Sequence, residues 1–303
     1  MAHKSVLLKE VIEYLNPRPG QVFVDGTANG GGHTMAIAEK VALDGKVIAI
    51  EWDSELAREL ELKFQVLSFK NNVIVANDSY ANLKNILNEL KVEKIDGVVL
   101  DLGFSSSHLE GSGRGFSFQK DEPLDMRYNI KDGRAAAEIV NSYNEQELAD
   151  ILYKYGEERF SRQIAKKITE ERKKKRILTT FDLVMVIEKA VPAFYRKGRA
   201  YRQAGKINCA TRTFQALRIA VNRELENLEN VLPQIVEVLN QNGKVAIISF
   251  HSLEDRIVKN FFRDKSREGF LKIITKKPII AGEEEIKNNP RSRSAKLRVA
   301  MKI

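Results

Sequence analysis

Four acidic side chains follow one another along the first third of the chain at nearly constant intervals. They are Asp25, Glu51, Asp78 and Asp101, separated by 26, 27 and 23 residues. An apolar run precedes each acid, and each interval has the length of one strand plus one helix. Because the strands of a parallel sheet end at one edge, where ligands bind, the spacing predicts a rim of carboxylates around a ligand. Glu51 suits a ribose, since a carboxylate can accept hydrogen bonds from both hydroxyls.

A glycine-rich stretch lies directly after the first apolar run. Gly26, Gly30, Gly31 and Gly32 fall within seven residues, just before a helical pattern that begins at Thr34. Glycine lets the backbone turn sharply and approach a ligand without a Cβ in the way. A strand, a glycine loop and a helix N-terminus together present backbone N–H groups to a ligand. One glycine would indicate a tight turn between core elements, whereas four favour a nucleotide-like ligand.

Two nucleotide ligands fit a glycine loop followed by a ribose-binding acid. One is a nicotinamide dinucleotide, bound by oxidoreductases, and the other is S-adenosylmethionine, bound by methyltransferases. The dinucleotide fingerprint requires G-x-G-x-x-G, but Ala28 stands two residues after Gly26. No P-loop lysine motif is present, which disfavours phosphoryl transfer. Two β-like runs near the C-terminus, FLKIITKKPI and KLRVAMKI, predict the hairpin that ends a methyltransferase sheet. The sequence therefore favours S-adenosylmethionine.

The elements that must position these residues alternate between strand and helix. VFVD, KVIAIEWD, NVIVAND and IDGVVLDLG are the strand patterns, and helical patterns lie between them. The alternation predicts an α/β fold, a seven-stranded Rossmann-like sheet of the class I methyltransferase type with helices on both faces. A short helix precedes the first strand, and Ser5 is its expected N-cap.

The alternation stops after Asp101. A loop rich in glycine, serine and aromatic residues leads into purely helical patterns, for which Asn144 and Thr180 are expected caps. A strand pattern, NGKVAIISFHS, then resumes the sheet. We therefore expect a discontinuous methyltransferase domain of residues 1–106 and 207–303, interrupted by a loop and a small all-helical domain over residues 107–206.

The distribution of charge predicts a polyanionic partner. The chain of 303 residues has a formal net charge of +9, and it contains no acid between Glu188 and Glu224 or after Ile286. A third basic cluster is ERKKKR, which ends at Arg176. A merely solubilising surface usually mixes both signs, so acid-free stretches of this length favour a nucleic acid.

Other features narrow the class of protein. The single cysteine, Cys209, excludes an internal disulfide and fits a reducing cytosol. Four scattered histidines show no metal-ligand spacing, so no metal is expected. No apolar run approaches the roughly 18–20 residues of a membrane span, and the first residues show no cleavable signal pattern. We therefore expect a cytoplasmic protein with no membrane partner.

Eight sequence blocks, in order along nearly the whole chain, resemble a known enzyme family. The blocks are DGTANGGGH (25–33), IDGVVLDLGFSS (95–106), RGFSF (114–118), PLDMR (123–127), YGEERF (155–160), ATRTFQALRIAVNRELE (210–226), SFHSLEDRIVK (249–259) and NPRSRSAKLR (289–298). They are similar to blocks of the MraW/RsmH-type methyltransferases. The resemblance implies methyl transfer from S-adenosylmethionine to the exocyclic amine of a cytidine in the decoding region of bacterial small-subunit ribosomal RNA.

The resemblance also implies a set of cofactor contacts. Within this set, a loop triplet holds the methionine part, Glu51 binds the ribose and Tyr80 lies against the adenine. The full set is Gly31, Gly32, His33, Glu51, Tyr80, Asp101 and His108. Asn29 departs from the family pattern, which often has glycine at this place. Asparagine tolerates a positive φ, so we expect the bend to survive.

The acceptor amine sets the chemical problem, because its lone pair is delocalised into the cytosine ring. An acceptor near the amine would localise that lone pair and take the proton. Asp101, at the end of the fourth strand, is suited either to this role or to anchoring the cofactor. We expect it mainly to anchor the cofactor, with Ser105 or a backbone carbonyl of residues 101–104 engaging the amine.

Candidate contacts to RNA come from four other blocks. A target base must be unstacked to reach the site, and two aromatic residues could stack on it or simply pack in the core. Basic residues are candidates for the phosphate backbone, and His251 has packing as its alternative role. The candidates are Phe116, Phe118, Arg212, Thr213, His251, Arg291 and Arg293. With the acid-free stretches, they predict that the inserted domain takes part in RNA recognition.

Alternative functions remain open from the sequence. A methyltransferase acting on DNA or protein would have the same rim, and a non-catalytic RNA-binding factor of ribosome assembly would retain the fold. An NAD-dependent oxidoreductase is the weakest alternative. The expected partner is small-subunit ribosomal RNA or the assembled small subunit, and association as a homodimer is left open.

Overall fold

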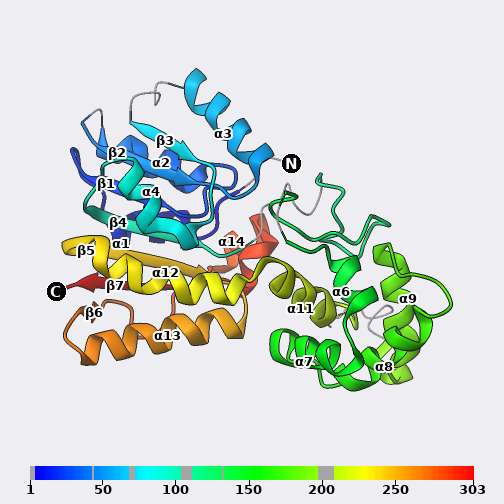
Figure 1. Ribbon diagram of the computed structural model, residues 1–303. Coiled ribbons are helices and arrows are strands. Elements are labelled where there is room, and N and C mark those ends of the chain that lie inside the picture. Colours follow the sequence, from blue (N-terminus) through cyan, green and yellow to red (C-terminus); the bar gives the residue numbers. More distant parts are fainter. Residues whose placement is uncertain (1–3, 43, 68–71, 104–110, 132, 197–207) are drawn as a thin grey trace. The chain divides into compact units, whose positions relative to one another are not determined.

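The computed structural model describes residues 4–42, 44–67, 72–103, 111–131, 133–196 and 208–303 (Figure 1). The chain forms two compact units. Unit 1 comprises Met1–Ser105 and Leu225–Ile303, and unit 2 comprises Ser106–Glu224. Among the described residues, none of the helices combines the length and apolar character needed to cross a lipid bilayer.

Unit 1 is built on a seven-stranded sheet in the order β3-β2-β1-β4-β5-β7-β6. The strands are β1 (Val22–Asp25), β2 (Lys46–Ile50), β3 (Val73–Ala76), β4 (Ile95–Asp101), β5 (Leu239–Ser249), β6 (Leu271–Ile273) and β7 (Lys296–Lys302). The pairs among β1 to β5 are parallel, whereas β7 runs antiparallel to both β5 and β6. The predicted class I methyltransferase sheet, with its C-terminal antiparallel pair, is confirmed.

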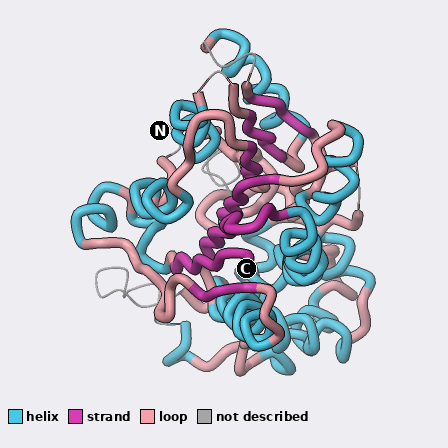
Figure 2. The backbone as a smooth tube through the Cα atoms, turned by 90° about the vertical axis from the view of Figure 1, so that its left-hand side faces the viewer, coloured by secondary structure: helices cyan, strands magenta, loops and turns pink. Residues whose placement is uncertain are grey.

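Helices cover both faces of this sheet, where Figure 2 shows the strands as one band. They are α1 (Leu8–Leu15), α2 (Gly32–Val41), α3 (Ser54–Val66), α4 (Leu83–Glu89), α12 (Glu224–Val238), α13 (Ser252–Arg267) and α14 (Glu283–Asn288), with short 3-10 turns η1 (Tyr80–Asn82) and η4 (Pro290–Ser294). Helices α1, α2 and α3 pack on one face, and α4, α12 and α13 pack on the other.

Successive residues of each central strand enter opposite faces of the sheet. Phe23 joins the core beneath α1 to α3, and Val24 joins the core beneath α4, α12 and α13. Val98 and Val99 divide in the same way. Because both faces are buried, the interior positions of the central strands are mostly apolar, which explains the continuous apolar runs in the sequence.

Unit 2 is a helical unit with its own hydrophobic core. Its helices are α6 (Ala136–Ser142), α7 (Glu145–Gly156), α8 (Ser161–Glu171), α9 (Thr180–Ala190), α10 (Ala193–Arg196) and α11 (Thr211–Asn222). Phe214 and Leu217 of α11 share this core with Leu148 and Leu152 of α7. The second domain boundary, predicted at residues 206/207, therefore lies after α11, at residues 224/225.

Two expected helix caps are wrong. Helix α1 begins at Leu8 rather than near Ser5, and its N-cap residue Leu7 has φ 51° and makes no side-chain cap. The Leu7 N–H instead donates to Glu285 Oε1 at 2.8 Å, a partner far along the chain that no local pattern shows. Thr179, not Thr180, caps α9, because the Thr180 hydroxyl donates to the Lys120 carbonyl. Asn144 caps α7 as predicted.

A tight contact at Gly97 provides a test of the central sheet. Gly97 pairs with Phe23 of β1, and an added Cβ would lie 2.8 Å from Cδ1 of that ring. The ring is only 1% exposed, so it has no space into which it can move. We expect Gly97→Ala to lower the free energy of unfolding by about 2–3 kcal/mol through overpacking. Urea unfolding followed by circular dichroism measures the change.

Gly282→Ala is the matched control for this substitution. A Cβ at Gly282 meets no atom within 4 Å, and its backbone φ of −72° suits any residue. Its free energy of unfolding should stay within about 0.5 kcal/mol of the wild type. Equal unfolding midpoints for the two variants would contradict the close packing of β4 on Phe23.

Candidate cofactor site

The four rim acids lie where the sequence places them, at the carboxyl ends of four neighbouring strands. Asp25 ends β1 and Asp101 ends β4, the adjacent strand. Glu51 follows β2 directly, and Asp78 follows β3 by two residues. Strand β1 is the point at which the chain order of the sheet reverses, from β2 on one side to β4 on the other. Ligands of open α/β sheets bind at this switch point.

The glycine loop bends through two residues with positive φ. Asn29 has φ 48° and Gly31 has φ 76°, so the predicted conformation of Asn29 is confirmed. The Asn29 side chain closes the bend by donating to the Thr27 carbonyl at 2.9 Å. Helix α2 then begins at Gly32 without a side-chain cap. Its first N–H groups are therefore available to a ligand rather than to a capping residue.

Glu51 is buried, and two backbone N–H groups orient its carboxylate. Asn29 N–H donates to Oε2 at 2.9 Å, and Asp53 N–H donates to Oε1 at 2.9 Å. Each oxygen retains a further lone pair for a hydroxyl group of a ligand. Burial raises the pKa of Glu51 to about 7. The loop residue Asn29 is thus tied directly to the acid that was predicted to bind the ribose.

Asp101 is the least satisfied acid of the rim. It is 4% exposed, and its buried Oδ1 atom has no hydrogen-bond partner in the part of the chain that the structure describes. Burial raises the pKa of Asp101 to about 8, and the neighbouring charge of Asp25 adds to this effect. The Gly103 N–H acts in the opposite direction by donating to this carboxyl, but a buried carboxylate oxygen that lacks a donor is costly. A ligand that brings a hydrogen-bond donor or a positive charge would relieve that cost.

His33 links the loop to the two acids at the switch point. Its Nε2 atom lies 3.1 Å from the Val6 carbonyl, which assigns the proton to Nε2. Burial lowers the pKa of His33, so the ring is neutral, and its Nδ1 atom lies 4.0 Å from Asp101 Oδ2. Asp25 accepts a hydrogen bond from the Thr34 hydroxyl at 2.7 Å, and burial raises its pKa.

The structure brings most of the predicted cofactor contacts to one rim of unit 1. Gly31, Gly32 and His33 open α2, Glu51 follows β2, and Asp101 ends β4. Tyr80 begins η1 after β3, and its half-buried ring packs against the core on the α4 face. Ser105 and His108 lie outside the described residues.

Some candidate RNA contacts in unit 2 are packed in its interior instead. Phe116 is buried and stacks on Tyr128 at 5.4 Å, and Phe118 packs edge-on against Phe214 at 5.3 Å. Core packing, the alternative weighed for both rings, describes these contacts. Thr213 is fully buried, so its hydroxyl is not accessible to a phosphate. The helical pattern alone did not show which residues of α11 face inward.

The basic candidates and His251 lie nearer the surface. Arg212 is half-buried and donates to the Glu157 carbonyl at 2.7 Å. Arg291 and Arg293 lie in η4, half-buried and exposed respectively. His251 is the N-cap of α13, and its Nδ1 accepts from the Glu254 N–H. Its Nε2 lies 3.2 Å from Glu254 Oε1, although the two atoms are not aligned for a hydrogen bond.

Comparison with known proteins identifies the family. The MraW methylase family matches residues 1–303. The chain belongs to the MraW methylase family. A relative from Kosmotoga olearia, named Ribosomal RNA small subunit methyltransferase H, is 46% identical over 303 residues, covering 100% of this chain and 98% of the relative. The protein of the same name from Thermosipho melanesiensis is 47% identical over 301 residues, covering 99% and 98%.

A solved structure supports the fold of this MraW methylase. The crystal structure of a candidate rRNA methylase from Clostridium thermocellum aligns with a TM-score of 0.51, 11% sequence identity and 99% coverage of each chain. At this identity the likeness concerns the fold alone. Family membership confirms S-adenosylmethionine as the predicted cofactor. The rim fits this cofactor, since no described residue donates to Asp101 Oδ1 and each Glu51 oxygen retains a lone pair.

Two further residues of this MraW methylase act on Asp101, and neither was among the predicted contacts. The Thr27 hydroxyl accepts from the Asp101 N–H at 2.6 Å, which joins the glycine loop to the end of β4. Glu254 is 2% exposed, and its charge helps to raise the pKa of Asp101. The Glu254 carboxylate accepts from the Phe250 N–H at 2.8 Å. Its place three residues after His251 is the spacing of a capping box, which is a signal readable in the sequence.

The buried rim predicts an unusual pH dependence for this MraW methylase in the absence of cofactor. Unfolded carboxyls have pKa values near 4, whereas in the folded chain the pKa of Glu51 is about 7 and the pKa of Asp101 is about 8. Their contribution to stability is therefore fully present below about pH 4 and is lost as the pH rises through the folded values. We expect the free energy of unfolding to fall by about 2–4 kcal/mol between about pH 6 and about pH 8.5.

Urea unfolding at both pH values measures this dependence, and Asp101→Asn serves as the comparison. The variant cannot titrate at this position, so its free energy of unfolding should change less with pH than that of the wild type. Identical slopes for the two proteins would show that Asp101 does not hold a proton in the folded chain.

Proposed function

We propose that this MraW methylase transfers a methyl group from S-adenosylmethionine to the exocyclic amine of one cytidine in the decoding region of small-subunit ribosomal RNA. The unsatisfied Oδ1 of Asp101, at the switch point between β1 and β4, is the observation that carries the proposal. The full-length relatives named Ribosomal RNA small subunit methyltransferase H support the class of substrate. The eight blocks described above support the cytidine amine.

The cofactor supplies an electrophilic methyl group on a positively charged sulfur, so the protein mainly has to hold both reactants in line. In the proposal, Asp101 anchors the cofactor by accepting from its α-ammonium group, because an ammonium is a donor and a sulfonium is not. The ammonium gives Oδ1 its missing partner and favours the charged carboxylate. The uncapped start of α2, at Gly31, Gly32 and His33, faces the methionine carboxylate.

The nucleoside part is assigned to the next two strands. Glu51 accepts from the ribose hydroxyls while its orientation is held by the Asn29 and Asp53 N–H groups. The ring of Tyr80, after β3, lies against the adenine. Four neighbouring strand ends, those of β4, β1, β2 and β3, would thus hold the methionine, ribose and adenine parts of one ligand.

The reacting amine needs an acceptor on the side away from the methyl group. Ser105 or a backbone carbonyl of residues 101–104 is proposed to accept a hydrogen bond from this amine, which localises its lone pair, and the methylated amine then releases its proton to solvent. The target cytidine leaves its stack to reach the rim. Arg212, Arg291 and Arg293 remain proposed contacts to RNA phosphates, and His251 a proposed substrate contact.

Transfer of labelled methyl groups tests the substrate. Assembled small subunits, naked small-subunit RNA and DNA are offered in parallel, and labelled cytidine is expected only in the ribosomal substrates. Mass spectrometry of ribosomal RNA from a deletion strain should then reveal one missing cytidine methyl group. Label in DNA or protein would favour another substrate, whereas failure to bind S-adenosylmethionine by calorimetry would favour a non-catalytic RNA-binding factor.

A further inference from the structure

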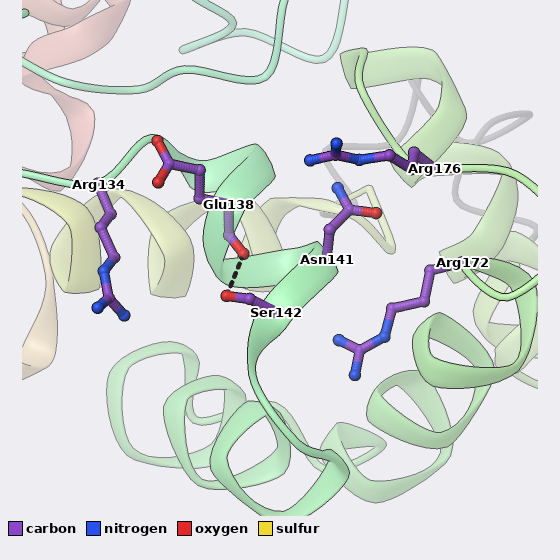
Figure 3. Close-up of a pocket in the computed structure, with 6 residues that line it drawn as sticks. All are labelled: Arg134, Glu138, Asn141, Ser142, Arg172 and Arg176. Carbon is purple, nitrogen blue, oxygen red and sulfur yellow. Dashed lines mark hydrogen bonds between the residues drawn. The ribbon is translucent and has the colours of Figure 1, made fainter.

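Unit 2 contains a pocket of about 550 Å³, and none of its lining residues belongs to the predicted cofactor contacts. Three arginines line it, together with one acid and two uncharged polar residues. The lining residues are Arg134, Glu138, Asn141, Ser142, Arg172 and Arg176. They come from α6, from the residue two positions before it, and from the end of α8 with its following turn. Figure 3 shows these side chains gathered around α6.

Most N–H donors of the three arginines have no acceptor among the described residues, although the Arg134 guanidinium lies over the Tyr143 ring at 5.9 Å. Among the described residues, neither Arg134 nor Arg176 has an acidic partner, and both side chains are exposed. Arg172 uses its Nη1 to donate to the Val140 carbonyl at 2.7 Å. A guanidinium carries five N–H donors in a planar fork that matches phosphate oxygens. The pocket therefore offers several guanidinium N–H donors to an anion.

The basic cluster ERKKKR is divided by the fold into two groups. Lys174 pairs with Glu171 at 2.9 Å, and Lys175 pairs with Asp182 at 3.0 Å. Arg172 and Arg176 instead line the pocket. Lys174 and Lys175 thus each have an acidic partner within unit 2, whereas Arg172 and Arg176 have none among the described residues.

Hydrogen bonds hold the pocket in shape. Asn141 of α6 donates to the Ile177 carbonyl at 2.7 Å and accepts from the Ile177 N–H at 3.1 Å. With the bond from Arg172 to Val140, these contacts tie α6 to the segment that follows α8. Preorganised donors lose less conformational entropy when a ligand binds.

The arrangement favours an extended anion over a single one. In Figure 3, Arg172 and Arg176 lie on one side of Glu138 and Ser142, and Arg134 lies on the other. The Glu138 carboxylate, which accepts from the Ala135 N–H at 3.3 Å, separates the two groups. One phosphate ion would contact only one group. A chain with a phosphate at each residue can contact both and avoid the acid between them.

We propose that this pocket binds the phosphodiester backbone of the RNA substrate, with Arg134 contacting one phosphate and Arg172 and Arg176 contacting another. The inference rests on the proposed function in one respect, namely that the polyanion is RNA. Backbone contacts of this kind position an RNA without reading its sequence. The pocket would thus raise the affinity for RNA and leave the chemistry at the rim unchanged.

The test compares two double variants that remove the same charge. Arg134→Gln/Arg176→Gln removes the exposed forks of the pocket, and Lys174→Gln/Lys175→Gln removes lysines that are already paired. The probe is a labelled single-stranded RNA of the small-subunit decoding region, titrated over a range of KCl concentrations. The arginine variant should bind it about 10–30-fold more weakly at moderate salt, with the salt slope reduced by roughly 1.4, since each lost phosphate contact on a single strand removes about 0.7.

Steady-state methylation separates this role from catalysis. The arginine variant should show a raised KM for RNA, an unchanged kcat and normal calorimetric affinity for S-adenosylmethionine. The lysine variant should match the wild type in all three, and inorganic phosphate should displace RNA from neither.

Equal salt slopes for the two variants would overturn the pocket proposal, and so would displacement of RNA by inorganic phosphate at matched ionic strength. A wild type that binds RNA but transfers no methyl group would count against the proposed function alone. Circular dichroism melts verify folding, and the single variant Arg176→Gln replaces the double one if the latter melts early.

Discussion

Asp101→Asn is expected to weaken the binding of S-adenosylmethionine by about 100-fold, which corresponds to roughly 3 kcal/mol. Among the described residues, the buried Oδ1 of Asp101 has no hydrogen-bond donor, and in the proposal the cofactor ammonium supplies one. The substitution keeps an oxygen of similar shape but removes the negative charge that the ammonium requires. Calorimetric titration near neutral pH measures the loss.

Two comparisons sharpen this prediction. Asp96→Asn is a matched control in the same strand, because Asp96 lies near the opposite end of β4 and accepts from the Val22 N–H. It should leave cofactor affinity unchanged. The product S-adenosylhomocysteine has lost the charge on sulfur but keeps the ammonium, so Asp101→Asn should weaken its binding about as strongly. Normal cofactor affinity with lost turnover would instead make Asp101 the acceptor for the amine.

Glu51→Gln is expected to weaken cofactor binding by about 30-fold, or roughly 2 kcal/mol. Both carboxylate oxygens accept backbone N–H groups, from Asn29 and from Asp53. A glutamine must turn its NH₂ group toward one of these donors, which breaks one bond and loosens the glycine loop. The ribose would then face an acceptor that has lost both its negative charge and its fixed orientation.

A 2′-deoxy analogue of S-adenosylmethionine shows whether Glu51 acts on the ribose. The wild type should bind the analogue several-fold more weakly than the natural cofactor, whereas Glu51→Gln should discriminate little between them. Such non-additivity is the signature of two groups in contact. Glu55→Gln, an exposed acid in the first turn of α3, is the control and should behave as the wild type. Equal discrimination by wild type and Glu51→Gln would place the ribose elsewhere.

The parts of the site that were predictable share a local origin. The acids recur once per strand and helix, so their spacing already implied that Asp25, Glu51 and Asp101 share one edge of a sheet. The positive φ of Asn29 followed from the glycine bend and the tolerance of asparagine for that region. Such features depend on residues that are close together in the sequence, so the residue types and their spacing are enough to predict them.

The features that sequence did not reveal depend on contacts between distant segments. Helix α1 begins after Leu7 rather than at the predicted cap Ser5, and Glu285 accepts from the Leu7 N–H. Helix α11 joined unit 2 because Phe214 and Leu217 complete a core with α7. The same packing buries Thr213 and Phe116, which their residue types alone left open as RNA contacts.

The sequence by itself determined the class of fold, the rim of acids and the nature of the cofactor, because each follows from periodicity, spacing and residue chemistry along one stretch of chain. Only the tertiary structure decided the protonation of Asp101 and the division of the basic cluster. Burial raises the pKa of Asp101 to about 8, and Arg134 and Arg176 line one pocket only when the helices pack. Desolvation and long-range contact are properties of the folded chain, and no local pattern encodes them.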